Sequence, residues 1–458
     1  MKGWRLAPAV AGTLAVLACA AGSAQAGPPG KWTQVTGKGS PDPNTLRVGL
    51  ARTPDGVLHV GWEQAGPGSG DFIQSSSISA DAKTVSGPVT IAAYMNGANH
   101  SVALAPVPGG GIRAFFAGLQ PGSPLDRVMA TSTSADGVTW TAAAPVSFNG
   151  AAAKPVYVAA GIAANVGLDG VFYSAWGDSG PGDGGFHVGL DSTAADGNFP
   201  AGLMSDPGIG VDSQSGQVVA AWNVIGGSVI AMLLKPAGAA LTIPNSTAAQ
   251  LQHTVGITGR IGAPGVYVAF AQGTNEFTAK PALFNVGTGK VTRLKGSDAE
   301  KISIAAAPGG RLWVFWKSGG TVFATRSNAA ATSFGPVRQV VAPGGKSSTI
   351  FDLAGEGSAG PLDVLALVQP SANTLANFHQ RILPALTLKE KKGKKGKTTF
   401  TVTDAGDAVA GAKVKVKGGK SGKTGSKGTV SITVAPGKHS ASASLTGYAV
   451  ASLRFNAK

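Results

Sequence analysis

The chain has 458 residues, a formal net charge of +15, 43% apolar residues and only 13% charged residues. So small a charged fraction excludes a disordered polyelectrolyte. The 68 glycines and 28 prolines follow no collagen-like period, and they leave little room for long helices. The composition therefore predicts a turn-rich all-β protein, and its length allows two or three domains.

The N-terminus has the pattern of an export signal. Lys2 and Arg5 precede an apolar run, and the small residues Ala24 and Ala26 fit a signal-peptidase site. We therefore expect residues 1–26 to be a cleaved signal peptide. No later apolar stretch approaches the ~20 residues of a spanning helix, so we expect no transmembrane span after cleavage. The mature protein would be secreted, either extracellular or associated with the cell wall.

Two alternatives stay open for this segment. One is a short N-terminal membrane anchor. The other is a lipoprotein attached through Cys19, because Val16-Leu17-Ala18-Cys19 loosely resembles a lipoprotein box. Cys19 is the only cysteine, so cleavage after Ala26 would leave a mature chain without disulfides, thiol catalysis or thiolate metal sites.

A repeated phrase occupies most of the mature chain: a glycine, five residues, and an aromatic residue that closes a β-branched run. Its copies are Gly56–Trp62, Gly110–Phe116, Gly170–Trp176, Gly216–Trp222, Gly310–Trp316, the shorter Gly265–Phe270 and a degenerate seventh, Asp363–Leu367. Each copy follows a short apolar strand, and an alternating third strand and a short fourth strand come after it. Four strands in each repeat of about 46 to 60 residues predict a six- or seven-bladed β-propeller over residues 31–383.

Two points about the repeat are open. An array of separate sandwiches would need roughly 100 residues for each unit, so the repeat favours the propeller. The sequence does not decide between six and seven blades. Lys31–Val35 is a candidate for the outer strand that completes the last blade.

One turn carries a family resemblance. Ser134-Ala-Asp136-Gly137-Val-Thr139-Trp140 resembles the Asp-box (BNR repeat) of sialidase-like β-propellers, and residues 79–84 are a decayed copy. The resemblance extends over residues 31–383. It implies that the aspartate accepts backbone N–H bonds, that the glycine adopts a conformation closed to bulky residues, and that the tryptophan packs between strands. In that family the box lies opposite the catalytic face, so the box is a structural element.

A second match bears on catalysis. Residues 46–51 resemble the segment that opens the first sialidase blade, which implies that Arg47 could grip a substrate carboxylate. Asp71 falls near the position of the family's acid and is the candidate proton donor. Glu63 is a further candidate carboxylate, but it stands where the family places a second arginine, and the family's Tyr–Glu nucleophile pair has no counterpart. A structural or relic role for Arg47 is the alternative.

The loops after the second strands carry most of the charged candidates for binding. These candidates are Glu63, Asp71, Asp126, Arg127, Asp178, Asp183, Glu276 and Lys317. Convergent polar groups around a central depression predict a glycan- or protein-binding site on this loop face, and ordinary solvated loops are the alternative. Asp178 and Asp183 could also wrap a calcium ion, although a plain turn accounts for the same residues. We expect no other metal or cofactor.

The C-terminal region differs in composition. A basic linker is expected over residues 384–398, and a small β-sandwich over residues 399–458, where 412–417 alternates valine with lysine. The phrases Val409–Val414 and Ser426–Val430 resemble carboxypeptidase-regulatory-like or bacterial Ig-like modules. That resemblance implies an Ig-like or transthyretin-like β-sandwich that serves as an appendage, spacer or stalk.

The charge is concentrated in this region. From residue 384 onward there are 15 Lys and Arg against 3 Asp and Glu, so the propeller is nearly neutral. We expect the basic region to bind a glycan or another envelope polyanion, with a merely soluble stalk as the alternative. Nucleic acid is not expected, because the basic tract lacks interleaved aromatics. The sequence thus predicts an exported bacterial, non-catalytic binding or scaffold protein; the alternative is a carbohydrate-active enzyme, a sialidase-like hydrolase or a polysaccharide lyase.

Overall fold

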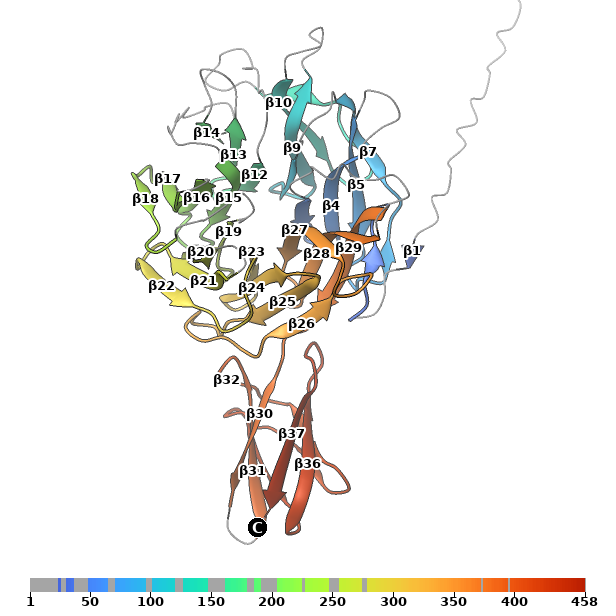
Figure 1. Ribbon diagram of the computed structural model, residues 1–458, viewed down its shortest axis with the longest axis vertical. Coiled ribbons are helices and arrows are strands. Elements are labelled where there is room, and N and C mark those ends of the chain that lie inside the picture. The colour runs from blue at the N-terminus through green and yellow to red at the C-terminus, as the bar shows by residue number, and fades with distance from the viewer. Residues whose placement is uncertain are drawn as a thin grey trace, which may run out of the picture.

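The computed structural model describes residues 24–25, 30–36, 48–64, 71–95, 101–119, 127–146, 161–178, 185–190, 204–224, 227–246, 255–273, 278–371, 374–393 and 396–457. These residues form strands and turns and contain no helix, as the density of glycine and proline predicts. Figure 1 shows a ring of sheets with a separate, smaller β-unit below it, in which the chain ends.

Seven sheets radiate from a central channel, and each contributes its first strand to the channel wall. These first strands are β3 (Gly49–Arg52), β8 (Val102–Pro106), β12 (Ile162–Val166), β15 (Met204–Val211), β19 (Gly256–Gly259), β23 (Lys301–Ala307) and β27 (Thr349–Glu356). Each first strand contacts the first strand of the next sheet, and β27 returns to β3. The described residues therefore form a closed seven-bladed propeller, which excludes both six blades and an array of separate sandwiches.

The second strands contain the repeated phrase. They are β4 (Leu58–Gln64), β9 (Ile112–Leu119), β13 (Phe172–Asp178), β16 (Val218–Val224), β20 (Val266–Gln272), β24 (Arg311–Ser318) and β28 (Leu362–Ser371). The glycine that opens each of the first six copies has a φ between 71° and 114°, in the region that side chains with a Cβ avoid, so it permits the tight turn from first to second strand. The aromatic residues that close these copies are all buried, each in a different apolar cluster. The period of the sequence is thus set by one turn and one core position in each blade.

The outer strands are shorter and less regular. The third strands are β5 (Asp71–Ile78), β10 (Arg127–Ser134), β14 (Gly185–Leu190), β17 (Val229–Lys235), β21 (Lys280–Asn285), β25 (Thr321–Arg326) and β29 (Thr374–Ile382). Outside them lie β6 (Thr84–Val85), β7 (Val89–Met95), β11 (Ala144–Pro145), β18 (Ala240–Thr242), β22 (Lys290–Arg293), β26 (Arg338–Val341) and β2 (Thr33–Gln34). In the first blade β6 and β7 both pair with β5, and β1 (Ala24–Gln25) pairs with β6.

The ring is closed by a strand from the N-terminal side of the chain. β2 pairs with β29, so the seventh blade combines residues that are more than 300 positions apart in the sequence. The N–H of Val35 donates to the carbonyl of Asn377 (2.8 Å), and the indole N–H of Trp32 donates to the carbonyl of Val341 in the sixth blade (2.8 Å). The expectation that Lys31–Val35 completes the last blade is confirmed.

A buried charge cluster joins the seventh blade to the first. Asp363 in β28 is fully buried and accepts hydrogen bonds from His379 (2.9 Å) and Arg381 (2.8 and 2.9 Å) in β29. Arg52 at the end of β3 donates to both Asp363 and Glu356. Although burial raises the pKa of Asp363, these donors outweigh burial and hold the pKa well below its usual range. The cluster therefore fixes the junction between the two blades at which the ring closes.

The C-terminal unit is a sandwich of two sheets. One contains β30 (Thr387–Lys392), β31 (Lys397–Asp404), β32 (Asp407–Ala408) and β35 (Thr429–Thr433), and the other β34 (Ser421–Lys423), β33 (Lys413–Val416), β36 (Gly437–Ser444) and β37 (Ala451–Ala457). Alternate residues of both sheets meet in one core around Phe400 and Phe455, whose rings lie edge to face at 5.2 Å. We call this sandwich the basic module.

The expected linker over residues 384–398 needs correction. Residues 387–392 form β30, which pairs with β31 along its length, so most of the lysine-rich segment belongs to the basic module. Leu388 is buried in the core, whereas Lys389 and Lys391 are exposed. A strand can place every second side chain in solvent, so a high lysine content does not prevent pairing when the alternate residues are apolar or shielded.

The basic module is fixed to the propeller through charged side chains of the sixth blade. Asp404 is buried and is paired with Arg326 and with Arg311 (3.3 Å to Arg311). Asp407 accepts from Arg311 (2.6 Å) and from the N–H of Ala329 (2.8 Å). All these contacts come from the end of the blade where first and second strands are joined, which is the end opposite the loops between second and third strands. We call these two ends of the propeller the turn end and the loop end.

Candidate functional site

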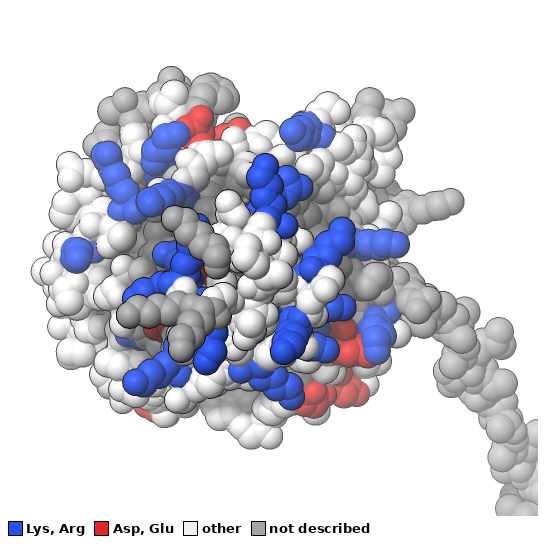
Figure 2. Space-filling model, turned by 90° about the horizontal axis from the view of Figure 1, so that it is seen from below, with Lys and Arg blue, Asp and Glu red and all other residues white. Residues whose placement is uncertain are grey.

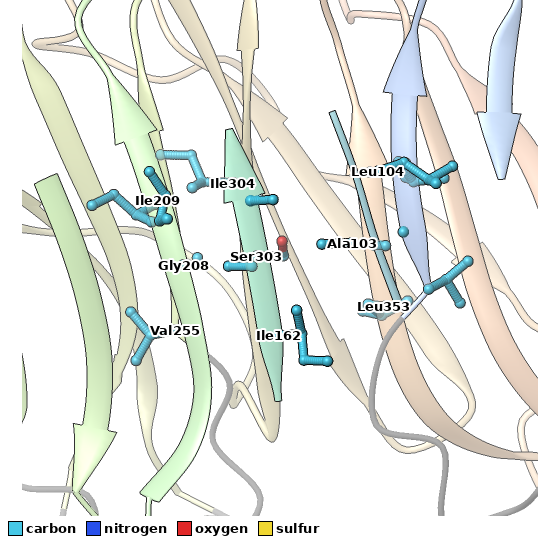
Figure 3. Close-up of a pocket in the computed structure, with 18 of the residues that line it drawn as sticks. Ala103, Leu104, Ile162, Gly208, Ile209, Val255, Ser303, Ile304 and Leu353 are labelled. Atoms are coloured by element: carbon cyan, nitrogen blue, oxygen red, sulfur yellow. The ribbon is translucent and has the colours of Figure 1, made fainter. Parts of the chain in front are cut away.

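The central channel is lined mainly by small and apolar residues. A cavity of about 210 Å³ is lined by residues from all seven first strands. The side chains labelled in Figure 3 are carbon-only except for Ser303, which contributes one hydroxyl. The lining residues include no titratable group, so the side chains of the channel wall supply no acid or base.

Charged groups of the sixth and seventh blades lie at the loop end of the channel strands. Lys301, the first residue of β23, forms an ion pair with Asp352 of β27 (2.6 Å), and both side chains are almost fully buried. Lys317, near the end of β24, pairs with Glu300 (3.0 Å), whose second oxygen accepts the N–H of Gly319 (2.7 Å). These pairs cross-link neighbouring strands, and they compensate each other's charge inside the propeller.

Three of these residues were not identified from the sequence. Glu300 and Lys301 stand at the start of one first strand, and Asp352 is the fourth residue of another, β27. A charged residue opening an apolar inner strand is a usable signal, but the partner of Lys301 lies 51 positions away in another blade. Only the ring arrangement brings these two residues together.

The predicted binding residues that the structure describes lie at the loop end. Glu63 is fully buried at the end of β4, and Lys317 is mostly buried in its pair with Glu300. Asp71 and Arg127 are the first residues of β5 and β10, and Asp178 is the last residue of β13. The backbone thus brings these five positions to one end of the ring, where the sequence placed them. Whether they bind a ligand stays a prediction.

The other predicted sites lie outside the described residues. These are Arg47, Asp126, Asp183 and Glu276, together with Cys19 and almost all of the expected signal peptide. The suggested calcium site at Asp178 and Asp183 therefore stays a prediction. Within the described ranges, no group of three His, Cys, Asp or Glu side chains is arranged to hold a metal ion.

The turn that resembles an Asp-box lies between β10 and β11, at the turn end. The carboxylate of Asp136 accepts the N–H groups of Val138 (2.8 Å) and Thr139 (2.7 Å) and the hydroxyl of Ser134 (3.0 Å). The Thr139 and Val138 N–H groups and the Ser134 hydroxyl lower the pKa of Asp136 to about 2. Gly137 has a φ of +72°, and a Cβ there would lie 2.3 Å from the ring of His59 in the preceding blade. The turn therefore has a structural role between the first two blades.

Two further turns share this geometry. Asp81 accepts Ser79 (2.8 Å) and the N–H of Lys83 (3.1 Å), and Ala82 takes the position of the glycine with a φ of +58°. In the sixth blade Asn328 stands at the position of Ser79: its carboxamide oxygen accepts the N–H groups of Thr332 (2.8 Å) and Ser333 (3.2 Å), as the Ser79 hydroxyl accepts those of Lys83 and Thr84, and Ala331 has a φ of +56°. Hydrogen bonds to the local carboxamide or carboxylate thus stabilise the turn even where alanine stands in place of glycine.

Among the described residues, the aspartates whose pKa is shifted are poor candidates for a proton donor. They are Asp55, Asp81, Asp136, Asp169, Asp212 and Asp363, and in each the pKa is lowered because hydrogen bonds to the carboxylate outweigh burial. A general acid must still hold its proton near neutral pH, which requires a raised pKa. None of these six residues can therefore supply the acid of a glycosidase.

Comparison with known proteins shows similarity in fold. Neither a protein-family model nor a curated protein sequence matches the chain. A Dyadobacter fermentans protein of unknown function is 13% identical, with 77% of this chain and 97% of that chain covered and a TM-score of 0.45. An α-L-arabinanase of Penicillium chrysogenum is 13% identical (79% and 98% covered, TM-score 0.42), and the six-bladed lectin of Aleuria aurantia is 15% identical (61% and 90% covered, TM-score 0.39). The blade count of the present chain comes from its own strand order.

The described residues were also compared with what a membrane span requires. None of them forms a helix with the length and hydropathy needed to cross a bilayer.

Proposed function

We propose that this chain is an exported bacterial binding or scaffold protein without catalytic activity, which acts at the cell envelope or outside the cell. The propeller would recognise a glycan or a protein at its loop end. The basic module would attach the protein to an envelope polyanion. The assignment of the propeller to the sialidase-like, Asp-box family and of the module to the Ig-like type belongs to this proposal.

The observation that carries the proposal is the fixed junction between the two units. Asp404 and Asp407 bind Arg311 and Arg326 at the turn end of the sixth blade. The strands of that blade run from this junction to the loop end. If the basic module is attached to the envelope, the loop end therefore lies at the opposite end of the blade from the junction. A rigid mount of this kind suits display of a binding face, whereas the channel wall and the six aspartates with lowered pKa offer no catalytic acid.

A pair of matched variants tests the loop end. D71N/R127Q removes one acid and one base at the starts of two third strands, and D81N/K83Q removes one acid and one base at the turn end. On a broad glycan array and against secreted proteins, the wild type and D81N/K83Q should bind the same ligand. D71N/R127Q should bind it at least about tenfold more weakly.

The same protein is assayed for catalysis against a panel of neutral and acidic glycans, with reducing-end release for hydrolysis and double-bond absorbance for lyase chemistry. If the wild type turns over a glycan and D71N/R127Q does not, the protein is a carbohydrate-active enzyme instead. Equal binding by the two double variants would show that the loop end is not the recognition surface.

A further inference from the structure

The basic module has one exposed sheet face that carries most of its positive charge. We call the solvent-facing side of the β34–β33–β36–β37 sheet the lysine face. A residue belongs to this face if it alternates with the buried residues of its strand, such as the valines of β33, or is paired across strands with a residue that does. Six exposed cations meet this condition: Lys413, Lys415, Lys417, Lys423, Lys438 and Arg454. The intervening Val414 and Val416 are buried in the core, so the two-residue period of β33 separates a lysine side from a valine side.

Hydroxyl and amide groups alternate with these cations across the sheet. Lys415 is paired with Ser421 on one side and Ser442 on the other, Arg454 is paired with Ser440, and Lys438 is paired with Asn456. Neighbouring strands lie about 4.8 Å apart, and side chains on one face recur about every 6.8 Å along a strand. On this face Lys413, Lys415, Lys438 and Arg454 therefore each have a neutral hydrogen-bonding group beside them on a neighbouring strand.

The basic module has few acidic residues that could neutralise the lysine face. The region from residue 384 to the end contains three acidic residues. Asp404 and Asp407 are paired with arginines of the propeller, and Glu390 lies in β30 of the other sheet. Lys413 and Lys423 even stand directly opposite each other on adjacent strands, an arrangement that destabilises a sheet unless a counter-charge is present.

A groove opens at the end of this face that is farthest from the propeller. Lys417, Lys438, Arg454 and Asn456 line it together with the imidazole of His439, and its volume is about 510 Å³. The C-terminus lies at the same end of the basic module (Figure 1), and Figure 2 shows that Lys and Arg outnumber Asp and Glu on the molecule seen from this side. The groove is shallow, and Ser440 and Phe455 complete its lining, so an anionic chain can lie along it beside the three cations.

We propose that the lysine face and its distal groove bind a linear anionic polysaccharide. The inference rests on the proposed function, because it names the polyanion to which the basic module attaches the propeller. Lysines that recur along β33 and arginine or lysine on β36 and β37 can pair with several carboxylates or sulfates of one chain, because their side chains are long and flexible, and the serines and Asn456 can donate to and accept from sugar hydroxyls.

The composition of the face argues against other polyanions. Among the described residues of the basic module, Val450 is the one large apolar side chain that is well exposed, which leaves little to insert into a lipid bilayer. Phe455 is only 7% exposed, so its ring offers no platform for stacking nucleic-acid bases.

Two matched double variants of the full chain test the proposal. K415S/K417S removes two lysines from the lysine face, and K389S/K391S removes two lysines with the same two-residue spacing from the opposite sheet. The probe is sodium alginate, with dextran as the neutral control; binding is measured by biolayer interferometry at 50 and 300 mM NaCl. The wild type and K389S/K391S should bind alginate alike and more weakly at high salt, and K415S/K417S should bind at least about tenfold more weakly. Dextran should not bind.

Several outcomes would overturn the proposal. Equal losses in the two variants would mean that net charge alone attracts alginate. Binding to vesicles of phosphatidylcholine and phosphatidylglycerol, but not to alginate, would identify a membrane surface instead. Thermal melting of both variants must match the wild type; if K415S/K417S melts earlier, K438S/R454S replaces it and must show the same loss. The wild type and K415S/K417S are also tested for binding of the loop-end ligand. If the lysine face alone is wrongly assigned, both proteins still bind that ligand; if the loop end is wrongly assigned, neither does.

Discussion

Asp404 is the residue on which the junction between propeller and basic module depends most. Its carboxylate is buried, accepts hydrogen bonds from Arg326 and from the hydroxyl of Tyr448 (3.2 Å), and forms an ion pair with Arg311 (3.3 Å). In D404N an amide of the same shape leaves Arg326 buried without its anionic partner. We expect this variant to weaken docking of the basic module while each unit stays folded.

The magnitude follows from the partners that remain. Removing one member of a buried ion pair costs about 3–5 kcal/mol. Arg326 keeps the carbonyl of Gly360 (3.4 Å) and the face of the Tyr448 ring (5.2 Å), and Arg311 keeps Asp407. The lower end of the range, about 3 kcal/mol, therefore applies, and it corresponds to roughly a hundredfold loss in the docking equilibrium.

The assay combines limited trypsin digestion with small-angle X-ray scattering. In the wild type, Arg311 and Arg326 are largely buried at the junction. In D404N, cleavage after these two residues should accelerate at least tenfold, and the maximum dimension should broaden. D81N, which removes an exposed carboxylate at the turn end of the first blade, serves as the control and should behave like the wild type. A D404N protein with wild-type cleavage rates and scattering would refute the view that this charge network holds the two units together.

Three further predictions concern the propeller. D363N should lower the free energy of unfolding by about 3 kcal/mol, because it leaves Arg381 and its neighbours buried without an anion. Since the folded-state pKa of Asp363 is depressed, its contribution is complete above the unfolded value near pH 4 and is lost progressively as the pH falls towards the folded-state pKa; the difference in urea stability between wild type and D363N should therefore begin to shrink below about pH 4 and keep shrinking with further acidification. G137A should destabilise by about 1–3 kcal/mol, because it combines a positive φ with a clash against His59, and an unchanged melting temperature would contradict the role given to this turn. V35D should open the ring, because it places a charge in the core beneath β2, and it should be detected as loss of the cooperative melting transition. Conservative V35I should retain that transition.

The repeat of the propeller could be predicted from the sequence because its cause is local. A glycine with positive φ, a β-branched run and a buried aromatic residue recur within each blade, and they need no knowledge of the rest of the molecule. The seventh copy was detected only as Asp363–Leu367. In the structure its turn glycine is Gly360 (φ +103°), so the position six residues later is Ala366, a buried alanine where the other copies have an aromatic residue.

The candidate site was predicted only in outline. Alternation and strand order were enough to place Glu63, Asp71 and Lys317 at one end of the blades. They were not enough to show that Lys317 is already paired with Glu300, or that residues 387–392 form a strand instead of a linker. Both facts depend on which residues of a neighbouring strand lie opposite Lys317 and opposite residues 387–392. The order of residues along the chain does not contain that information.

The sequence by itself determined that the protein is all-β, that its blades repeat, and that its positive charge is concentrated after residue 384. The tertiary structure decided the number of blades, the pairing of β2 with β29, and the contacts of Arg52 with Asp363 and of Arg326 with Asp404. The division has a physical reason. Turns and alternation are set by neighbouring residues, whereas ring closure and domain docking join residues that are 78 to more than 300 positions apart and meet only once the blades have packed.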